Sequence, residues 1–217
     1  MFIQKKLAAV IDHTLLNPEA TKKALTQLCE EAKQYDFAGV CVNACNIPFV
    51  VKQLQGTDIK PIATVGFPLG ANTTEAKSFE AKDAIIKGAS EIDMVINIGA
   101  LKDKNYQLVY QDILHVVAAA RPYPVKVIIE TGRLQTNEKI AASVLAQAAG
   151  AAFIKTSTGF STTGATIEDI ELIRQVVGSD MKIKAAGGIR TRADAEQMMA
   201  AGADRIGTSN GVAIINE

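Results

Sequence analysis

The sequence lacks the features that mark several classes of protein. Its 217 residues hold 23 basic and 23 acidic side chains, so it lacks the positive excess of proteins that bind nucleic acid or anionic lipid. It also lacks any apolar run near the roughly 18 residues of a membrane-spanning helix. The opening segment, Met1 to Val10, carries Gln4, Lys5 and Lys6 and has no signal-peptide layout. We therefore expect a cytoplasmic protein with no nucleic-acid partner and no membrane partner.

Cysteine and histidine are scarce as well. The three cysteines, Cys29, Cys41 and Cys45, form an odd set that is typical of a reducing compartment. Cys41 and Cys45 lie close together, but the two histidines, His13 and His115, are far apart in the sequence. A zinc site needs more clustered ligands than this. We expect neither a metal nor an organic cofactor.

Short β-branched runs alternate with longer helical patterns along the chain. Eight such runs are found, at Ile11–Leu15, Val40–Asn43, Pro61–Gly66, Ile92–Ile98, Val125–Thr131, Phe153–Ser157, Lys182–Gly187 and Arg205–Ser209. Between them lie segments with helical periodicity, such as the one in which Val109, Ile113, Val116 and Ala120 would share an apolar face. Regular alternation of this kind predicts parallel strands that are joined by helical crossovers.

Two architectures show this alternation, the closed barrel and the open doubly wound sheet. Units repeated at a spacing of roughly 25 residues favour the barrel. The G-x-G-x-x-G turn of a nucleotide-binding sheet is absent, and no Pro/Ser-rich linker divides the chain. We predict an α/β fold, a single-domain (β/α)8 TIM barrel over residues 1–217. It should have a short N-terminal helix at Met1–Val10 and a short or incomplete eighth helix.

Three segments share one sequence frame: Gly88–Asp93, Gly150–Lys155 and Gly202–Gly207. Each opening glycine is predicted to end a helix in a left-handed cap before the next strand begins. The last residues of the three frames therefore fall at equivalent places in their strands. Two of these last residues are charged, where packing alone would favour Val or Ile.

Charged side chains are predicted inside the barrel. Side chains alternate between the two faces of a strand, and the aliphatic faces should meet the helices, so Asp93, Lys155 and Lys184 should point inward. Lys126 in the fifth strand is expected at a solvated end.

A buried charge is costly unless it is paired or neutralised. One interpretation is a structural ion pair; the other is Schiff-base catalysis, in which a second lysine favours the neutral form of the first. Two lysines for one acid favour catalysis, with the aspartate and the second lysine moving protons.

Glycines and hydroxyl groups follow the last three predicted strands, in the segments Thr156–Phe160, Ala186–Arg190 and Gly207–Gly211. Backbone N–H groups in glycine turns can approach an anion closely. The loops after the seventh and eighth strands are frequent phosphate sites in this fold. We therefore expect a substrate that bears a phosphate.

Five segments together resemble the deoxyribose-phosphate aldolase family: Ile11–Leu16, Gly39–Asn43, Glu91–Val95, Phe153–Phe160 and Lys182–Arg190. The Lys-Thr-Ser-Thr-Gly and Lys-x-Ala-Gly-Gly-Ile-Arg runs are specific in combination, and the likeness extends in order from Ile11 to Gly211. It implies a class I aldolase of deoxyribose phosphate catabolism. The implied reaction is the reversible cleavage of 2-deoxy-D-ribose 5-phosphate to D-glyceraldehyde 3-phosphate and acetaldehyde.

The resemblance also implies roles for individual residues. Lys155 matches the Schiff-base lysine, Lys184 the second lysine that assists it, and Asp93 the acid/base aspartate. The implied phosphate-binding residues are Gly159, Gly187, Gly188, Ser209 and Asn210, and those expected near the substrate are Asp12, Cys41 and Thr156. The implied partner is a small sugar phosphate, and a homodimer is expected because closed dimers are common among such enzymes.

Two other functions remain open on the sequence. The chain could be another class I aldolase or a transaldolase on the same barrel, which would share the lysine but differ in substrate. It could also be a phosphate-binding barrel without catalysis, in which Asp93, Lys155 and Lys184 form an ion network. The lysine pair argues against the second alternative, because one lysine already satisfies one aspartate.

Overall fold

The structure is a computed structural model that describes residues 7–217, and its eight parallel strands close into one barrel in sequence order. The strands are β1 (Ile11–Leu15), β2 (Gly39–Asn43), β3 (Lys60–Val65), β4 (Glu91–Val95), β5 (Val125–Ile128), β6 (Phe153–Lys155), β7 (Lys182–Ala186) and β8 (Arg205–Thr208). The barrel closes between β1 and β8, where Asp12 pairs with Gly207. The predicted (β/α)8 barrel is confirmed.

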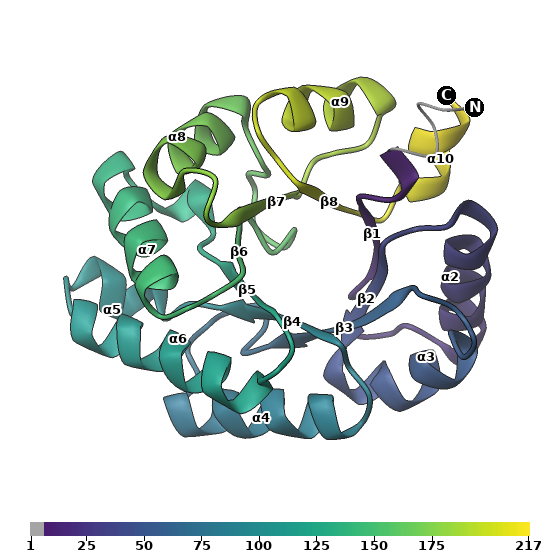
Figure 1. Cartoon of the computed structure of the whole chain (residues 1–217), viewed down its shortest axis with the longest axis horizontal. Coiled ribbons are helices and arrows are strands. Elements are labelled where there is room, and N and C mark those ends of the chain that lie inside the picture. The colour runs from purple at the N-terminus through teal and green to yellow at the C-terminus, as the bar shows by residue number, and fades with distance from the viewer. Residues whose placement is uncertain (1–6) are drawn as a thin grey trace.

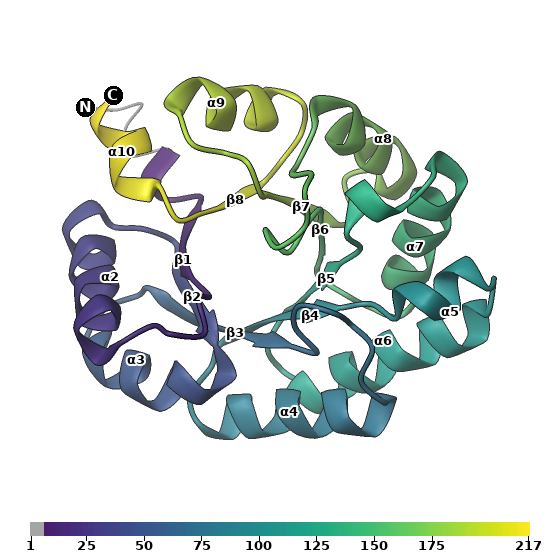
Figure 2. The same ribbon diagram turned by 180° about the vertical axis from the view of Figure 1, so that it is seen from behind.

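Helices form a ring around the strands, as Figure 1 and the opposite view in Figure 2 show. They are α2 (Lys22–Tyr35), α3 (Ile47–Gln53), α4 (Thr74–Ile86), α5 (Ile98–Lys102), α6 (Tyr106–Ala120), α7 (Thr136–Ala148), α8 (Ile167–Val177), α9 (Arg192–Ala200) and α10 (Gly211–Asn216), with short 3-10 turns at Ala44–Asn46 and Thr131–Arg133. Two helices, α5 and α6, follow β4. No helix in residues 7–217 is both long enough and apolar enough to cross a membrane.

Because side chains alternate along each strand, the protein has two separate interiors: one between the strands and the helices, and one inside the barrel. Ile92 and Met94 of β4 belong to the apolar layer that lies between the strands and the helices. Asp93, between them, faces the inside of the barrel. On α6, Val109 and Ile113 are fully buried, as the helical periodicity predicts. The main apolar layer therefore lies outside the strands, and the inner face carries polar groups beside a small apolar cluster of Leu16, Cys41 and Ile62.

The predicted glycine caps are confirmed, since Gly88, Gly150 and Gly202 have φ values of +101°, +80° and +115°. The predicted short last helix is also confirmed, because α10 has six residues. The predicted helix at Met1–Val10 lies largely outside the described residues.

Several predicted strands were too long at their carboxyl ends. The run Ile92–Ile98 leaves the ladder after Val95, and Val125–Thr131 leaves it after Ile128. Buried isoleucines, Ile96 and Ile129, continue the apolar pattern past the last strand residue. The chain turns there into the loops that form the mouth of the barrel.

Candidate active site

The inner face of the barrel holds a buried cluster of charges centred on Asp93. Its Oδ1 accepts a hydrogen bond from Lys126 on β5, and its Oδ2 accepts from Lys155 on β6 and Lys184 on β7, each at 2.8 Å. Burial alone would raise the pKa of Asp93. The three ammonium groups outweigh burial and hold that pKa well below the ordinary 3.8. Asp93 is therefore ionised at neutral pH.

Three further groups close this cluster into a ring. The Oδ2 of Asp12 lies 2.5 Å from the Nζ of Lys184, and its Oδ1 lies 2.7 Å from Nη1 of Arg205. Arg205 also approaches Glu91 at 3.5 Å, and Glu91 in turn pairs with Lys126. The ion pairs thus run from Asp93 around the inner wall and return to it.

The ring holds four cations and three carboxylates. Lys126, Lys184 and Arg205 each contact two carboxylates, whereas Lys155 contacts one carboxylate within residues 7–217, that of Asp93. Burial by itself would lower the pKa of Lys184, but its two carboxylate partners raise it above the ordinary 10.5. The pKa of Lys126 is raised in the same way, against burial, chiefly by Asp93. Lys155 is therefore the cation with the fewest counter-charges.

The prediction that Lys126 sits at a solvated end is wrong. Its side chain is fully buried and bonds Asp93. Lys126 is the register partner of Asp93 across β4 and β5, and register partners point to the same side of a sheet. The alternation of Val125 and Val127 around Lys126 is the sequence signal that indicates an inward direction.

Gly207 provides the space that the Lys184 side chain occupies. A Cβ atom at Gly207 would lie 2.8 Å from Cε of Lys184 and 3.1 Å from Cβ of Ala186. The third sequence frame therefore ends in glycine where the other two end in charged residues. The absence of a side chain on β8 leaves room for the lysine on β7.

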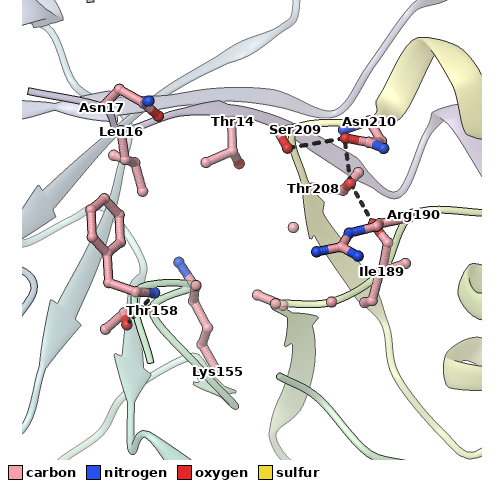
Figure 3. A pocket seen from close by; sticks show the side chains of 16 residues that line it. Thr14, Leu16, Asn17, Lys155, Thr158, Ile189, Arg190, Thr208, Ser209 and Asn210 are labelled. Carbon is pink, nitrogen blue, oxygen red and sulfur yellow. Dashed lines mark hydrogen bonds between the residues drawn. The ribbon is translucent and has the colours of Figure 1, made fainter. Parts of the chain in front are cut away.

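A cavity of about 230 Å³ opens at the carboxyl ends of the strands (Figure 3). The amine of Lys155 points into it from β6, while the loops after β7 and β8 form the opposite wall. All the residues predicted for phosphate binding line this cavity, namely Gly159, Gly187, Gly188, Ser209 and Asn210. The first three have φ values of +86°, +86° and +78°, a region that glycine adopts without strain.

Sequence reasoning missed Arg190 as a member of the site. Its guanidinium faces the cavity from the side opposite Lys155 (Figure 3). Thr208 fixes the loops next to it, because its hydroxyl donates to the carbonyl of Ile189 at 2.8 Å and accepts from the N–H of Asn210 at 2.9 Å. The available signal was that Arg190 is the one cation in the glycine-rich segment Ala186–Arg190.

The three residues expected near the substrate, Asp12, Cys41 and Thr156, do not line the cavity. Asp12 pairs with Lys184, as described above. Cys41 places its Sγ 3.8 Å from Oδ2 of Asp93; burial and that carboxylate raise the pKa of the thiol to about 11, so Cys41 stays protonated at neutral pH. Thr156 bridges β6 and β7, since its hydroxyl donates to the carbonyl of Ala186 and accepts from its N–H, both at 3.0 Å.

A parallel barrel whose lysine amine enters a cavity at the carboxyl ends of the strands, beside a carboxylate and a second lysine, defines an enzyme of the Schiff-base aldolase class. Residues 6–216 match the model of the DeoC/LacD family aldolase. The chain belongs to this family, and it is an aldolase.

Individual relatives are similar over nearly their whole length. The deoxyribose-phosphate aldolase of Streptococcus sanguinis (strain SK36) is 59% identical over 97% of this chain and 96% of its own. That of Clostridium novyi (strain NT) is 55% identical, over 94% of this chain and 93% of its own. The solved deoxyribose phosphate aldolase of Aeropyrum pernix, described as tetrameric, is 30% identical with a TM-score of 0.93, and the match covers 100% of this chain and 92% of that one.

Replacing Asp93 by Asn should lower the free energy of unfolding by about 3–5 kcal/mol at neutral pH, because three buried lysines lose a shared carboxylate. Urea unfolding measures the change. Asp83→Asn is the matched control: its pair with Lys87 is on the surface and should contribute less than about 1 kcal/mol. Equal losses in the two variants would contradict the central position of Asp93.

The effect of Asp93→Asn on the free energy of unfolding should depend on pH. The folded-state pKa of Asp93 is depressed, so its stabilisation is fully present above the ordinary value of 3.8 and is lost as the pH falls through the folded pKa. The difference in stability between the wild type and Asp93→Asn should therefore narrow in acid.

Proposed function

We propose that the protein cleaves 2-deoxy-D-ribose 5-phosphate reversibly to D-glyceraldehyde 3-phosphate and acetaldehyde, through a Schiff base on Lys155. The observation that carries the proposal is that the Lys155 amine points into a cavity whose far wall is formed by glycine loops and Arg190. The relatives at 59% and 55% identity support the substrate, because both are named deoxyribose-phosphate aldolases.

The charge balance of the ring supports Lys155 as the nucleophile. Only a neutral amine can attack a carbonyl carbon. Loss of one proton from Lys155 would leave three cations against three carboxylates, a balanced set inside a poorly solvated interior. Lys184 is charged in the resting site, since its two carboxylate partners raise its pKa.

Cleavage needs protons to move at three places on the substrate. The Lys155 amine attacks C1 of the open-chain sugar, and the resulting hydroxyl leaves as water after it gains a proton. The C3 hydroxyl then loses a proton as the C2–C3 bond breaks, and the electron pair of that bond passes into the iminium to give an enamine. Protonation of the enamine at C2 and hydrolysis release acetaldehyde. Asp93 and Lys184 carry these protons, because Oδ2 of Asp93 lies 2.8 Å from both lysine nitrogens.

The phosphate of the substrate binds on the opposite wall. Gly187, Gly188 and Ser209 offer backbone N–H groups and a hydroxyl there, and Arg190 supplies a positive charge. A sugar phosphate bound in this way spans the cavity from its phosphate to the amine of Lys155.

Two alternatives differ in measurable ways. Another class I aldolase or a transaldolase would release acetaldehyde poorly from the 2-deoxy sugar and would act on other sugar phosphates. A phosphate-binding barrel without catalysis would bind phosphate but form no covalent adduct.

We also propose that the enzyme is a cytoplasmic homodimer. Light scattering would test the dimer against twice the chain mass of 23.0 kDa.

The identity of the reactive lysine can be tested by trapping. Borohydride reduction in the presence of acetaldehyde should add a two-carbon group to the peptide that contains Lys155, which intact mass and peptide mapping detect. Lys155→Ala should abolish both the adduct and turnover. Lys184→Leu should slow turnover and move adduct formation to higher pH, because a neighbouring positive charge is lost. An adduct on Lys184 in the wild type would reverse these two roles.

Phosphate recognition should be separable from the chemistry. Ser209→Glu should raise KM for 2-deoxyribose 5-phosphate by about tenfold or more, through repulsion between the new carboxylate and the dianion. It should barely change kcat/KM for unphosphorylated 2-deoxyribose. Ser179→Glu is the matched control, on an exposed residue near the amino end of β7. Equal losses on both sugars would mean that the phosphate binds elsewhere.

A further inference from the structure

Glu130 occupies an unusual position at the mouth of the barrel. It follows β5, is 2% exposed and has a φ of +56°, a left-handed conformation that is unfavourable for residues other than glycine. The chain on both sides of it is fixed to the β6 segment. The N–H of Ile129 donates to the carbonyl of Lys155 at 3.0 Å, and the N–H of Thr131 donates to that of Thr156 at 2.9 Å. Glu130 thus projects from a short rigid segment beside the reactive lysine's own strand.

The Glu130 carboxylate acts only as an acceptor in the hydrogen bonds of residues 7–217, and all of its donors lie in one loop. The N–H of Thr158 lies 3.3 Å from both oxygens, and the Thr158 hydroxyl donates to Oε2 at 2.5 Å. The Ser161 hydroxyl donates to Oε1 at 3.0 Å. The N–H of Phe160 donates to the Thr158 hydroxyl at 3.1 Å, which extends the set by one residue. One charged group therefore organises the loop Thr158–Ser161.

This loop forms part of the wall of the cavity. Thr158, Gly159 and Phe160 all line the cavity together with Lys155. Gly159 adopts a φ of +86°, and apart from the glycine itself and its two chain neighbours no atom of the described residues lies within 4 Å of the place where its Cβ would be. Side-chain packing around Gly159 therefore does not hold this turn in place. Its position depends on its neighbours: Phe160 packs against Phe67 with ring centroids 5.3 Å apart, and the hydrogen bonds of Thr158 and Ser161 converge on Glu130.

We propose that Glu130 is a positioning residue for phosphate recognition: its carboxylate holds the Thr158–Ser161 loop so that the backbone of Gly159 meets the substrate phosphate. Glu130 does not itself line the cavity that the amine of Lys155 enters. The inference rests on the function proposed above. An amide is a poor substitute for the carboxylate, because each recorded partner of Glu130 is a donor and an amide offers one acceptor oxygen in place of two.

Glu130→Gly is the most informative variant, because glycine accepts a φ of +56° without strain, so the backbone conformation is retained while the side chain and its hydrogen bonds are removed. KM for 2-deoxyribose 5-phosphate should rise by about tenfold or more. The values of kcat for that sugar, kcat/KM for unphosphorylated 2-deoxyribose and the rate of borohydride-trapped adduct with acetaldehyde should stay close to wild type. Ser161→Ala, which removes one of the hydrogen bonds, should give a smaller rise in KM. Glu171→Gln on the exposed face of α8 is the charge-matched control and should change none of these values.

The possible outcomes separate this inference from the proposed function. Equal losses on the phosphorylated and unphosphorylated sugars, or an unchanged KM in Glu130→Gly, would overturn the positioning role. Failure of both Glu130→Gly and Glu130→Gln to fold would show that Glu130 is structural, which overturns it as well. Absence of an acetaldehyde adduct in the wild type would instead contradict the proposed function itself.

Discussion

The carboxylate of Asp93 binds three lysine ammonium groups in the interior of the barrel, and much of the site follows from that arrangement. Buried ammonium groups are stable only with counter-charges at short range. Asp12 and Glu91 extend the set, so that a ring of ion pairs lines the inner wall. Gly207 leaves room for the Lys184 side chain. The ring thus fixes the amine of Lys155, which contacts one carboxylate, whereas each of the other three cations contacts two.

The barrel separates this ring from the loops that we propose to bind the phosphate. The ring is formed by residues within the strands, whereas the cavity wall is formed by loops after the strands. This division is general in (β/α)8 barrels, whose strands give rigidity and whose loops give specificity. Glu130 links the strands to the loops here. Its neighbours in the chain are fixed to the β6 segment, and its side chain holds the Thr158–Ser161 loop. In the proposed mechanism, reactivity and phosphate recognition therefore have separate physical origins, which single substitutions can separate.

The sequence predicted the barrel and the lysine pair because both follow from local patterns. The strand alternation directed Lys155 and Lys184 inward, and the glycine frames gave the helix ends. The inward direction of Lys126 follows from the alternation with Val125 and Val127, but its pairing with Asp93 depends on the register of β5 against β4, which no local pattern determines. Arg205 was missed for a related reason: its partner Asp12 is 193 positions away and meets it only where the barrel closes. Glu130 gave no signal, since its conformation and its loop partners appear only in three dimensions.

The most direct test of the charge balance uses Lys126→Met, which removes one cation that does not line the cavity. The ring would then hold three cations against three carboxylates while Lys155 is still charged. We predict that the rate of borohydride-trapped adduct formation at Lys155 reaches half its maximum at a pH about one unit or more above that of the wild type. Glu91→Gln, which removes a carboxylate from the same ring, should shift the profile to lower pH. Identical pH profiles for the wild type and both folded variants would contradict the claim that the surplus charge of the ring activates Lys155.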